Sequence, residues 1–284
     1  MAKILVTGAA GFIGRSLVRL LEYEQHDVLQ LTSSDGDVAD LSTWQNLPKV
    51  DHVFHLAGKS YVPDSWLTPE VFLKTNLHGT WQALEFCRKN NADMTYVSAY
   101  IYGAPQFLPI TENHPIEPSN PYALSKFMAE EACKFYAKTN RMNVAIIRPF
   151  NVYGPGQREE FLIPEIISKV ISGKDIELKD LKPRRDYVYL DDVVDALFKT
   201  MKIASGLHIV NIGSGESYSV AEVVEAVQAV AGTKLNVVSE NIVRQQEISE
   251  TIADISEANH LLGWKPQFSL MQGITKVLEM EAHN

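Results

Sequence analysis

The sequence has few cysteines and no long hydrophobic segment. Only Cys87 and Cys133 occur among its 284 residues, and neither has a CxxC partner or a histidine cluster beside it. Structural metal sites need several closely spaced ligands, so we interpret both thiols as free and buried and expect no metal. No apolar run approaches the roughly 18 residues of a membrane span, and the apolar residues 4–6 are followed at once by glycines, unlike a signal peptide. We therefore expect a cytoplasmic protein that does not interact with membranes.

Positive charge is also scarce. The chain has 26 lysines and arginines against 35 aspartates and glutamates, which gives a formal net charge of −9. A nucleic-acid-binding protein needs a basic face, so no nucleic acid is expected as a partner. An anionic small ligand would have to be met by local groups instead. The remaining composition, 45% hydrophobic and 21% charged, is typical of a globular protein that folds by itself.

A glycine-rich turn lies close to the start of the chain. Residues 3–8 form a short apolar run rich in β-branched side chains, and residues 12–21 carry apolar residues at helical spacing. Glycines between a strand and a helix allow a tight turn and a close approach of the backbone to a pyrophosphate, at which the helix N-terminus points its N–H groups. We predict a dinucleotide site made by Gly8, Gly11, Phe12, Ile13 and Gly14.

Strand and helix signals then alternate along the chain. The later predicted strands cover residues 28–31, 52–56, 94–97, 143–147 and 207–211. This alternation predicts an α/β fold with a Rossmann-type, doubly wound parallel sheet. Two amphipathic patterns, at residues 161–171 and 219–231, predict helices in a smaller α/β lobe. We assign residues 1–155 to the dinucleotide-binding domain, with a returning segment near residues 187–213, and residues 156–284 mainly to the smaller lobe.

Several motifs together resemble the extended short-chain dehydrogenase/reductase family, in its NAD-dependent epimerase/dehydratase branch. They are Gly8-x-x-Gly11-x-x-Gly14, His55-Leu56-Ala57-Gly58, Asn76-Leu77-His78-Gly79-Thr80, Tyr122-x-x-x-Lys126, Arg148-Pro149-Phe150-Asn151-Val152-Tyr153-Gly154, Arg185-Asp186-Tyr187-Val188 and Leu262-Gly263-Trp264-Lys265-Pro266. The match covers nearly the whole chain, and the motifs are specific only in combination. The resemblance implies an enzyme that acts on a nucleotide sugar. It also implies a homodimer, formed through the helix from Tyr122 and the helix from Glu70.

The resemblance implies a catalytic triad of Ser98, Tyr122 and Lys126. A spacing of four residues places Tyr122 and Lys126 on one helix face. A lysine cation beside a phenol favours the phenolate and would lower the tyrosine pKa from about 10 toward neutrality. Tyr122 would then transfer a proton, Lys126 would hold the nicotinamide ribose, and Ser98 would donate a hydrogen bond to the reacting sugar oxygen.

The resemblance also implies further binding residues. Cofactor contacts are expected from Leu56, Ala57 and Lys59. Asp40 and Leu41 follow the second strand, where Asp40 could bind the adenine amino group, or could instead cap a helix. The substrate diphosphate would be held by Asn151, Arg185 and Arg244.

The end of the second strand bears on the choice of cofactor. Enzymes specific for NAD place an acidic residue there to bind the ribose hydroxyls. This sequence has Thr32, Ser33 and Ser34, whose hydroxyls accommodate a 2′-phosphate, and Arg15 could add positive charge. We therefore expect NADP(H) rather than NAD(H), although Asp35 keeps NAD(H) open.

The residues after Ser98 bear on the reaction. Relatives that dehydrate the sugar carry a carboxylic acid in these two positions, where this chain has Ala99 and Tyr100. Neither side chain can protonate a leaving hydroxyl as a carboxylic acid does. We therefore expect reduction of the 4-keto group of a nucleotide-linked 4-keto-6-deoxyhexose, with GDP or dTDP as the nucleotide. A nucleotide-sugar 4-epimerase is the alternative enzyme. A dinucleotide-sensing module without turnover is the alternative of another class, and the intact triad argues against it.

Overall fold

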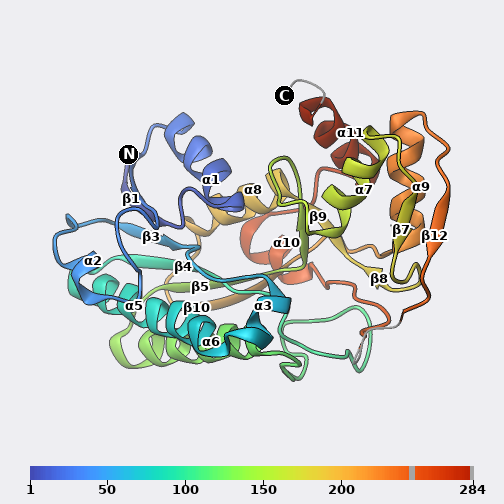
Figure 1. The fold of residues 1–284 in the computed structure, drawn as a ribbon. Coiled ribbons are helices and arrows are strands. Elements are labelled where there is room, and N and C mark those ends of the chain that lie inside the picture. Colours follow the sequence, from blue (N-terminus) through green and yellow to red (C-terminus); the bar gives the residue numbers. More distant parts are fainter. Residues whose placement is uncertain (243–246, 282–284) are drawn as a thin grey trace.

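The central sheet is parallel throughout and has six strands in the order β10-β5-β4-β3-β1-β2. The computed structural model describes residues 1–242 and 247–281 (Figure 1). The strands are β1 (Lys3–Thr7), β2 (Asp27–Leu31), β3 (His52–His55), β4 (Asp93–Val97), β5 (Val144–Pro149) and β10 (Leu207–Ile212). The chain winds outward from β1 in both directions, so the order of strands reverses between β1 and β3. Ligands bind at such a reversal, at the carboxyl ends of the strands. The predicted doubly wound sheet is confirmed.

Helices cover both faces of this sheet (Figure 1). One face carries α1 (Phe12–Tyr23), α8 (Leu190–Thr200) and α10 (Ser256–Leu262). The other carries α2 (Leu41–Gln45), α3 (Val62–Leu67), α4 (Pro69–Phe72), the π-helical turn η1 (Leu73–His78), α5 (Gly79–Asn90) and α6 (Pro121–Asn140). A separate apolar core fills each side of the sheet. The core beneath α1 and α8 includes Trp264, which is completely buried and donates its indole N–H to the Asp192 carbonyl at 2.9 Å. The segment around Trp264 therefore returns to the first domain.

The smaller lobe combines short strand pairs with three helices. Its elements are β6 (Asn151–Tyr153), α7 (Leu162–Ile171), β7 (Ile176–Leu178), β8 (Arg184–Arg185), β9 (Tyr187–Tyr189), β11 (Tyr218–Ser219), α9 (Val220–Ala231), β12 (Val237–Ser239) and α11 (Leu270–Glu281). Strand β6 pairs with β9, β7 with β12, and β8 with β11. The predicted helices are confirmed: Ser219 and Glu222 form a capping box that starts α9, and left-handed Gly232 ends it. No helix in residues 1–242 and 247–281 is long and apolar enough to cross a membrane.

Candidate active site

The glycine turn joins β1 to α1, and it has no room for a side chain at Gly8 or Gly14. Gly8 has a left-handed φ of +68°, and its N–H donates to the Leu31 carbonyl at 2.8 Å. A Cβ on Gly8 would lie 2.8 Å from the Ala57 nitrogen, and one on Gly14 would lie 2.1 Å from the Gly8 carbonyl oxygen. No side chain caps the N-terminus of α1. The glycines let the backbone of the turn approach a ligand closely, and the twelve-residue helix that follows has no side-chain cap at its N-terminus. Both features fit the pyrophosphate of a dinucleotide.

The loop after β3 packs directly against this turn. Leu56 and Ala57 donate their N–H groups to the carbonyl and the hydroxyl of Thr7, at 3.3 and 3.2 Å. Lys59 exchanges backbone hydrogen bonds with the buried Asn76 amide, at 2.8 and 3.0 Å. The same amide donates to the Ser125 hydroxyl of α6 at 2.8 Å. The structure thus brings Leu56 and Ala57 beside the glycine turn, and Asn76 ties Lys59 to the helix that carries Tyr122 and Lys126.

Hydroxyl groups gather at the end of β2, beside the glycine turn. Asp35 accepts hydrogen bonds from the Thr32 N–H at 2.8 Å and the Thr32 hydroxyl at 2.7 Å, which lowers the pKa of the Asp35 carboxyl. Ser33 and Thr32 directly follow the last residue of β2. The Asp35 carboxylate is therefore hydrogen-bonded within this loop.

Asp40 and Leu41 lie at the start of α2. Asp40 occupies the N-cap position, but its side chain makes no capping hydrogen bond and instead lies 3.4 Å from the Lys74 ammonium. Leu41 is half exposed. Both contacts with adenine stay predictions.

Tyr122 is the second residue of α6. The Asn120 side chain accepts from the Ala123 N–H at 2.8 Å and starts the helix, and Pro121 takes its first position. The Tyr122 ring is partly exposed and meets Phe72 edge to face, with 6.3 Å between ring centroids. Burial raises the pKa of the Tyr122 phenol, the reverse of the direction expected from Lys126.

Lys126 lies one helical turn further along α6 and is buried. Its ammonium donates to the Val97 carbonyl at 2.6 Å and lies 4.5 Å from the centroid of the Tyr96 ring. This contact holds the ammonium at the end of β4, and the expected effect of Lys126 on the phenol stays a prediction. Burial lowers the pKa of Lys126 to about 8, and the Glu130 carboxylate partly opposes that shift. Lys126 is still a cation at neutral pH.

Ser98 follows the last residue of β4 and is also buried. Its N–H donates to the Ile147 carbonyl at 2.7 Å, and its hydroxyl donates to Glu130 Oε1 at 2.5 Å. Glu130 was missed by the sequence analysis. The available signal was its place on α6, four residues after Lys126 on the same inward face. The three predicted catalytic residues therefore lie where β4 ends against α6, with Glu130 as a fourth member.

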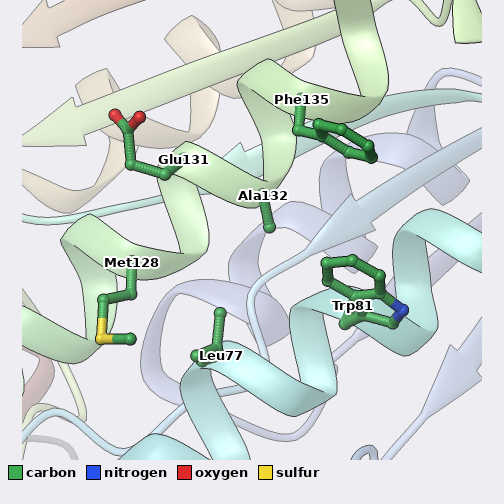
Figure 2. A pocket seen from close by; sticks show the side chains of 6 residues that line it. All are labelled: Leu77, Trp81, Met128, Glu131, Ala132 and Phe135. Atoms are coloured by element: carbon green, nitrogen blue, oxygen red, sulfur yellow. The ribbon is translucent and has the colours of Figure 1, made fainter. Parts of the chain in front are cut away.

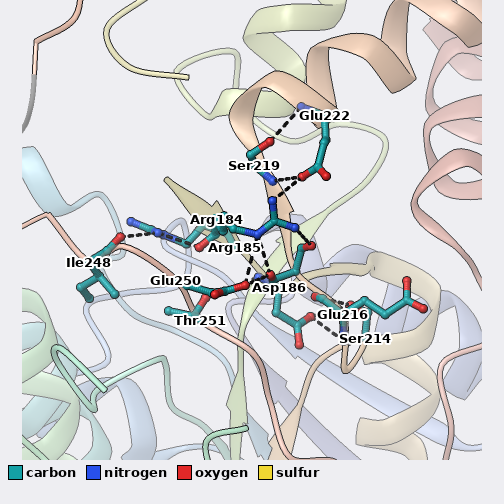
Figure 3. A network of polar contacts seen from close by, with 11 residues as sticks. Arg184, Arg185, Asp186, Ser214, Glu216, Ser219, Glu222, Ile248, Glu250 and Thr251 are labelled. Carbon is teal, nitrogen blue, oxygen red and sulfur yellow. Dashed lines mark hydrogen bonds and ion pairs between the residues drawn. The ribbon is translucent and has the colours of Figure 1, made fainter. Parts of the chain in front are cut away.

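The residues expected to hold the substrate belong to the smaller lobe. Asn151 donates its amide to the Asp186 carbonyl at 3.1 Å. The Arg185 guanidinium donates to the Ile248 carbonyl at 2.6 Å (Figure 3). It also pairs with Glu247, so it is engaged within the protein. Arg244 lies outside the described residues. The carboxylate of Asp186, next to Arg185, accepts from the Ser214, Gly215 and Ala253 backbone.

The chain is similar to known proteins over nearly its whole length. The family described as the NAD dependent epimerase/dehydratase family matches residues 4–213. A UDP-glucose 4-epimerase of Lactobacillus helveticus is 31% identical over 93% of this chain and 92% of its own. The GDP-6-deoxy-D-mannose reductase of Pseudomonas aeruginosa is 29% identical over 97% of this chain and 96% of its own. The structure of RMD from the same organism, complexed with NADPH, is 28% identical, superposes with a TM-score of 0.91, and covers 100% of both chains.

Proposed function

The chain belongs to the NAD-dependent epimerase/dehydratase family, and from that premise we propose that it reduces the 4-keto group of a GDP- or dTDP-linked 4-keto-6-deoxyhexose. A bound nicotinamide dinucleotide would supply the hydride for the ketone carbon. Tyr122 donates its phenolic proton to the ketone oxygen as that oxygen gains charge. Lys126 orients the nicotinamide ribose, and its cation stabilises the phenolate that Tyr122 becomes.

The proposal depends above all on the chemistry available beside the reacting carbon. Ser98 is followed by Ala99 and Tyr100, and the Tyr100 hydroxyl donates to the Gly103 carbonyl at 2.6 Å. Burial raises the pKa of Tyr100, so this phenol stays protonated and is no base at neutral pH. With no carboxylate in either position, the site supports proton and hydride transfer at one carbon, and not the elimination of water.

The hydroxyl residues at positions 32–34 favour reduction over the rival reaction. A reductase consumes NADPH as a reductant, whereas an epimerase holds NAD and recycles it. The similarity to UDP-glucose 4-epimerases nevertheless supports 4-epimerisation as the second candidate. The same three residues would serve it, with Tyr122 working in both directions.

We also propose NADP(H) as the preferred cofactor. No carboxylate occupies positions 32–34, and the neighbouring Asp35 is directed back onto Thr32. The Ser33 hydroxyl can donate to a 2′-phosphate, and the Thr32 hydroxyl could do so in place of its bond to Asp35. On the substrate side, Asn151, Arg185 and Arg244 would hold the diphosphate, and Arg185 would exchange Glu247 for it.

The decisive experiment follows the absorbance of the reduced nicotinamide. Purified protein receives freshly generated GDP- or dTDP-4-keto-6-deoxyhexose, with NADPH or NADH in turn. We expect stoichiometric consumption with one of the sugars, and faster consumption with NADPH. If a saturated nucleotide sugar changes configuration without net consumption, the 4-epimerase replaces the reductase. Dinucleotide binding without turnover of any sugar would instead identify a sensing module.

The pH dependence of turnover should reflect Lys126. Because its pKa is about 8, its ammonium is charged below that pH and loses its proton above it. We expect kcat/KM for the sugar to fall as the pH rises through about 8, since the neutral amine no longer stabilises the phenolate. Lys126→Arg, whose guanidinium stays charged, should lose this fall. A wild-type profile that stays flat to pH 9.5 would contradict the role of Lys126.

An apolar hollow lies on the helices through which the homodimer is predicted to form. Figure 2 shows this hollow between the helical segment of η1 and α5 and the outer face of α6. Its lining residues are Leu77, Trp81, Met128, Glu131, Ala132 and Phe135. Trp81 and Phe135 are 41% and 55% exposed. Apolar patches of this kind on a helix pair are typical of interfaces, and a second copy presenting the same face would cover both.

Phe135→Glu should convert a dimer into monomers. The substitution places a charge on the exposed apolar face, where its burial against a second copy would be unfavourable. Sedimentation equilibrium should give about half the wild-type mass. Tyr23→Glu, at an 82% exposed aromatic residue of α1, is the matched control and should leave the mass unchanged. A monomeric wild-type protein, or a dimeric Phe135→Glu variant, would refute this interface.

A further inference from the structure

A loop of the smaller lobe, residues 154–161 between β6 and α7, reaches the first domain at two points. The first point is on α1, where Arg15 Nη2 donates to the Gly156 carbonyl at 3.2 Å. The second is in the segment after β3, where the Tyr61 ring meets the Phe161 ring edge to face, with 6.1 Å between ring centroids. The loop therefore bridges the two lobes.

The two points lie on either side of the glycine turn. Arg15 is the fourth residue of α1, the helix that follows the turn. Tyr61 belongs to the segment between β3 and α3, and the Ala57 nitrogen of that segment would lie 2.8 Å from a Cβ on Gly8. Strands β1 and β3 are neighbours in the sheet, at the reversal of strand order. A loop held at both points crosses the opening at their carboxyl ends, where a dinucleotide binds in such sheets.

The loop is also attached to its own lobe. Gln157 Nε2 donates to the Val152 carbonyl of β6 at 2.8 Å. The Phe161 N–H donates to the Arg158 carbonyl at 3.2 Å. The Arg158 guanidinium lies 5.1 Å from the centroid of the Tyr61 ring, which adds a cation–π contact to the ring pair. Every contact to the first domain joins protein groups directly, so it can restrain the loop in the free protein and in the complex alike.

We propose that residues 154–161 form a latch over the dinucleotide site, which must open before a dinucleotide enters or leaves. The inference rests on the proposed dinucleotide site and goes beyond the proposed reaction, since it holds for any sugar. Opening is required equally in the free and the bound protein, so the latch slows entry and exit by the same factor and leaves the affinity unchanged. A reductase must release its oxidised cofactor after every turnover, and opening of the latch therefore sets an upper limit on kcat.

The test measures the association and dissociation rate constants of NADPH and NADH by stopped-flow fluorescence, without a sugar. Tyr61→Ala removes both ring contacts, and Arg15→Met removes the hydrogen bond to the loop. Each contact is weak, so we expect each variant to raise both rate constants by about two- to tenfold and to keep Kd within about twofold. Two matched controls should change neither rate constant: Trp66→Ala, at a 62% exposed aromatic residue of α3, and Arg19→Met, one turn further along α1.

A residue that contacts the dinucleotide itself would behave differently. Its loss would speed release alone and raise Kd, and this result for Tyr61→Ala would overturn the latch. Arg15 needs a further comparison, because a cation near the glycine turn can also attract the 2′-phosphate of NADPH. In that case Arg15→Met would raise Kd for NADPH and leave the rate constants of NADH unchanged. Loss of the latch changes the rate constants of both dinucleotides alike.

A cross-linked loop tests the same inference in the opposite direction. Tyr61→Cys combined with Phe161→Cys and joined by a short bismaleimide should nearly abolish exchange of the dinucleotide. Wild-type protein treated in the same way is the control, since its Cys87 and Cys133 are buried. Unchanged rate constants in Tyr61→Ala and Arg15→Met, or free exchange in the cross-linked protein, would overturn the latch and leave the proposed reaction in place. A wild-type protein that binds no dinucleotide would refute both proposals.

Discussion

Tyr122→Phe is expected to lower kcat by about 10²–10⁴-fold while leaving dinucleotide binding intact, because a positioned proton donor contributes a factor of that size. The variant keeps the aromatic ring that packs edge to face on Phe72, so α6 should keep its position. Only the phenolic oxygen is lost. Without this proton, the charge that develops on the ketone oxygen would go unneutralised.

The measurement combines single-turnover kinetics with a fluorescence titration of the reduced dinucleotide. Tyr136→Phe is the matched control, since Tyr136 lies on the same helix and its hydroxyl donates to Glu85 Oε1 at 2.6 Å. Loss of that hydrogen bond should cost about 1 kcal/mol of stability and leave kcat unchanged. Wild-type turnover in Tyr122→Phe would show that another group supplies the proton.

Gly14→Ala should remove most dinucleotide binding and destabilise the fold. The new methyl group would lie 2.1 Å from the Gly8 carbonyl oxygen, within the backbone of the turn itself, so the turn must open. Overpacking of this kind costs roughly 1–3 kcal/mol. Because each 1.4 kcal/mol is a factor of ten in affinity, we expect the dinucleotide Kd to rise by at least about tenfold.

Gly173→Ala is the control for the general effect of adding a methyl group to a glycine. A Cβ on Gly173 would meet no atom within 4 Å, and only its left-handed φ of +65° opposes the substitution. It should cost about 1–2 kcal/mol through the backbone alone and spare binding. Calorimetric titration of both variants with NADPH and NADH makes the comparison. Equal affinities for Gly14→Ala and wild type would show that the turn does not contact the dinucleotide.

Local sequence signals were enough to predict most of the first domain. The strands of the central sheet are apolar runs, and the glycines of the turn lie within seven consecutive residues, 8–14. Tyr122 and Lys126 were predicted to lie together because residues four apart on a helix share one face. The strand pairs of the smaller lobe, two or three residues long, have no such pattern, and the analysis did not find them.

The network around Ser98 could not be predicted in this way. Ser98 directly follows β4, whereas Glu130 lies on α6 and Arg148 on β5, and only tertiary packing brings them together. The position of the Lys126 ammonium could not be predicted for a related reason. Helical spacing places the two residues on one face, but it does not tell where a long side chain ends, and the ammonium ends on the Val97 carbonyl.

The burial of Trp264 has a consequence for the order in which the molecule is made. The core beneath α1 and α8 contains side chains from the first strand and also this indole, which is 0% exposed. During synthesis, residues 1–213 would leave the ribosome with part of that core uncovered, because the side chain that closes it is translated about fifty residues later. The core of the first domain is therefore complete only after Trp264 has been translated. A chain interrupted between the two would expose an apolar surface to chaperones and proteases, even though every residue of its glycine turn and catalytic helix had already been made.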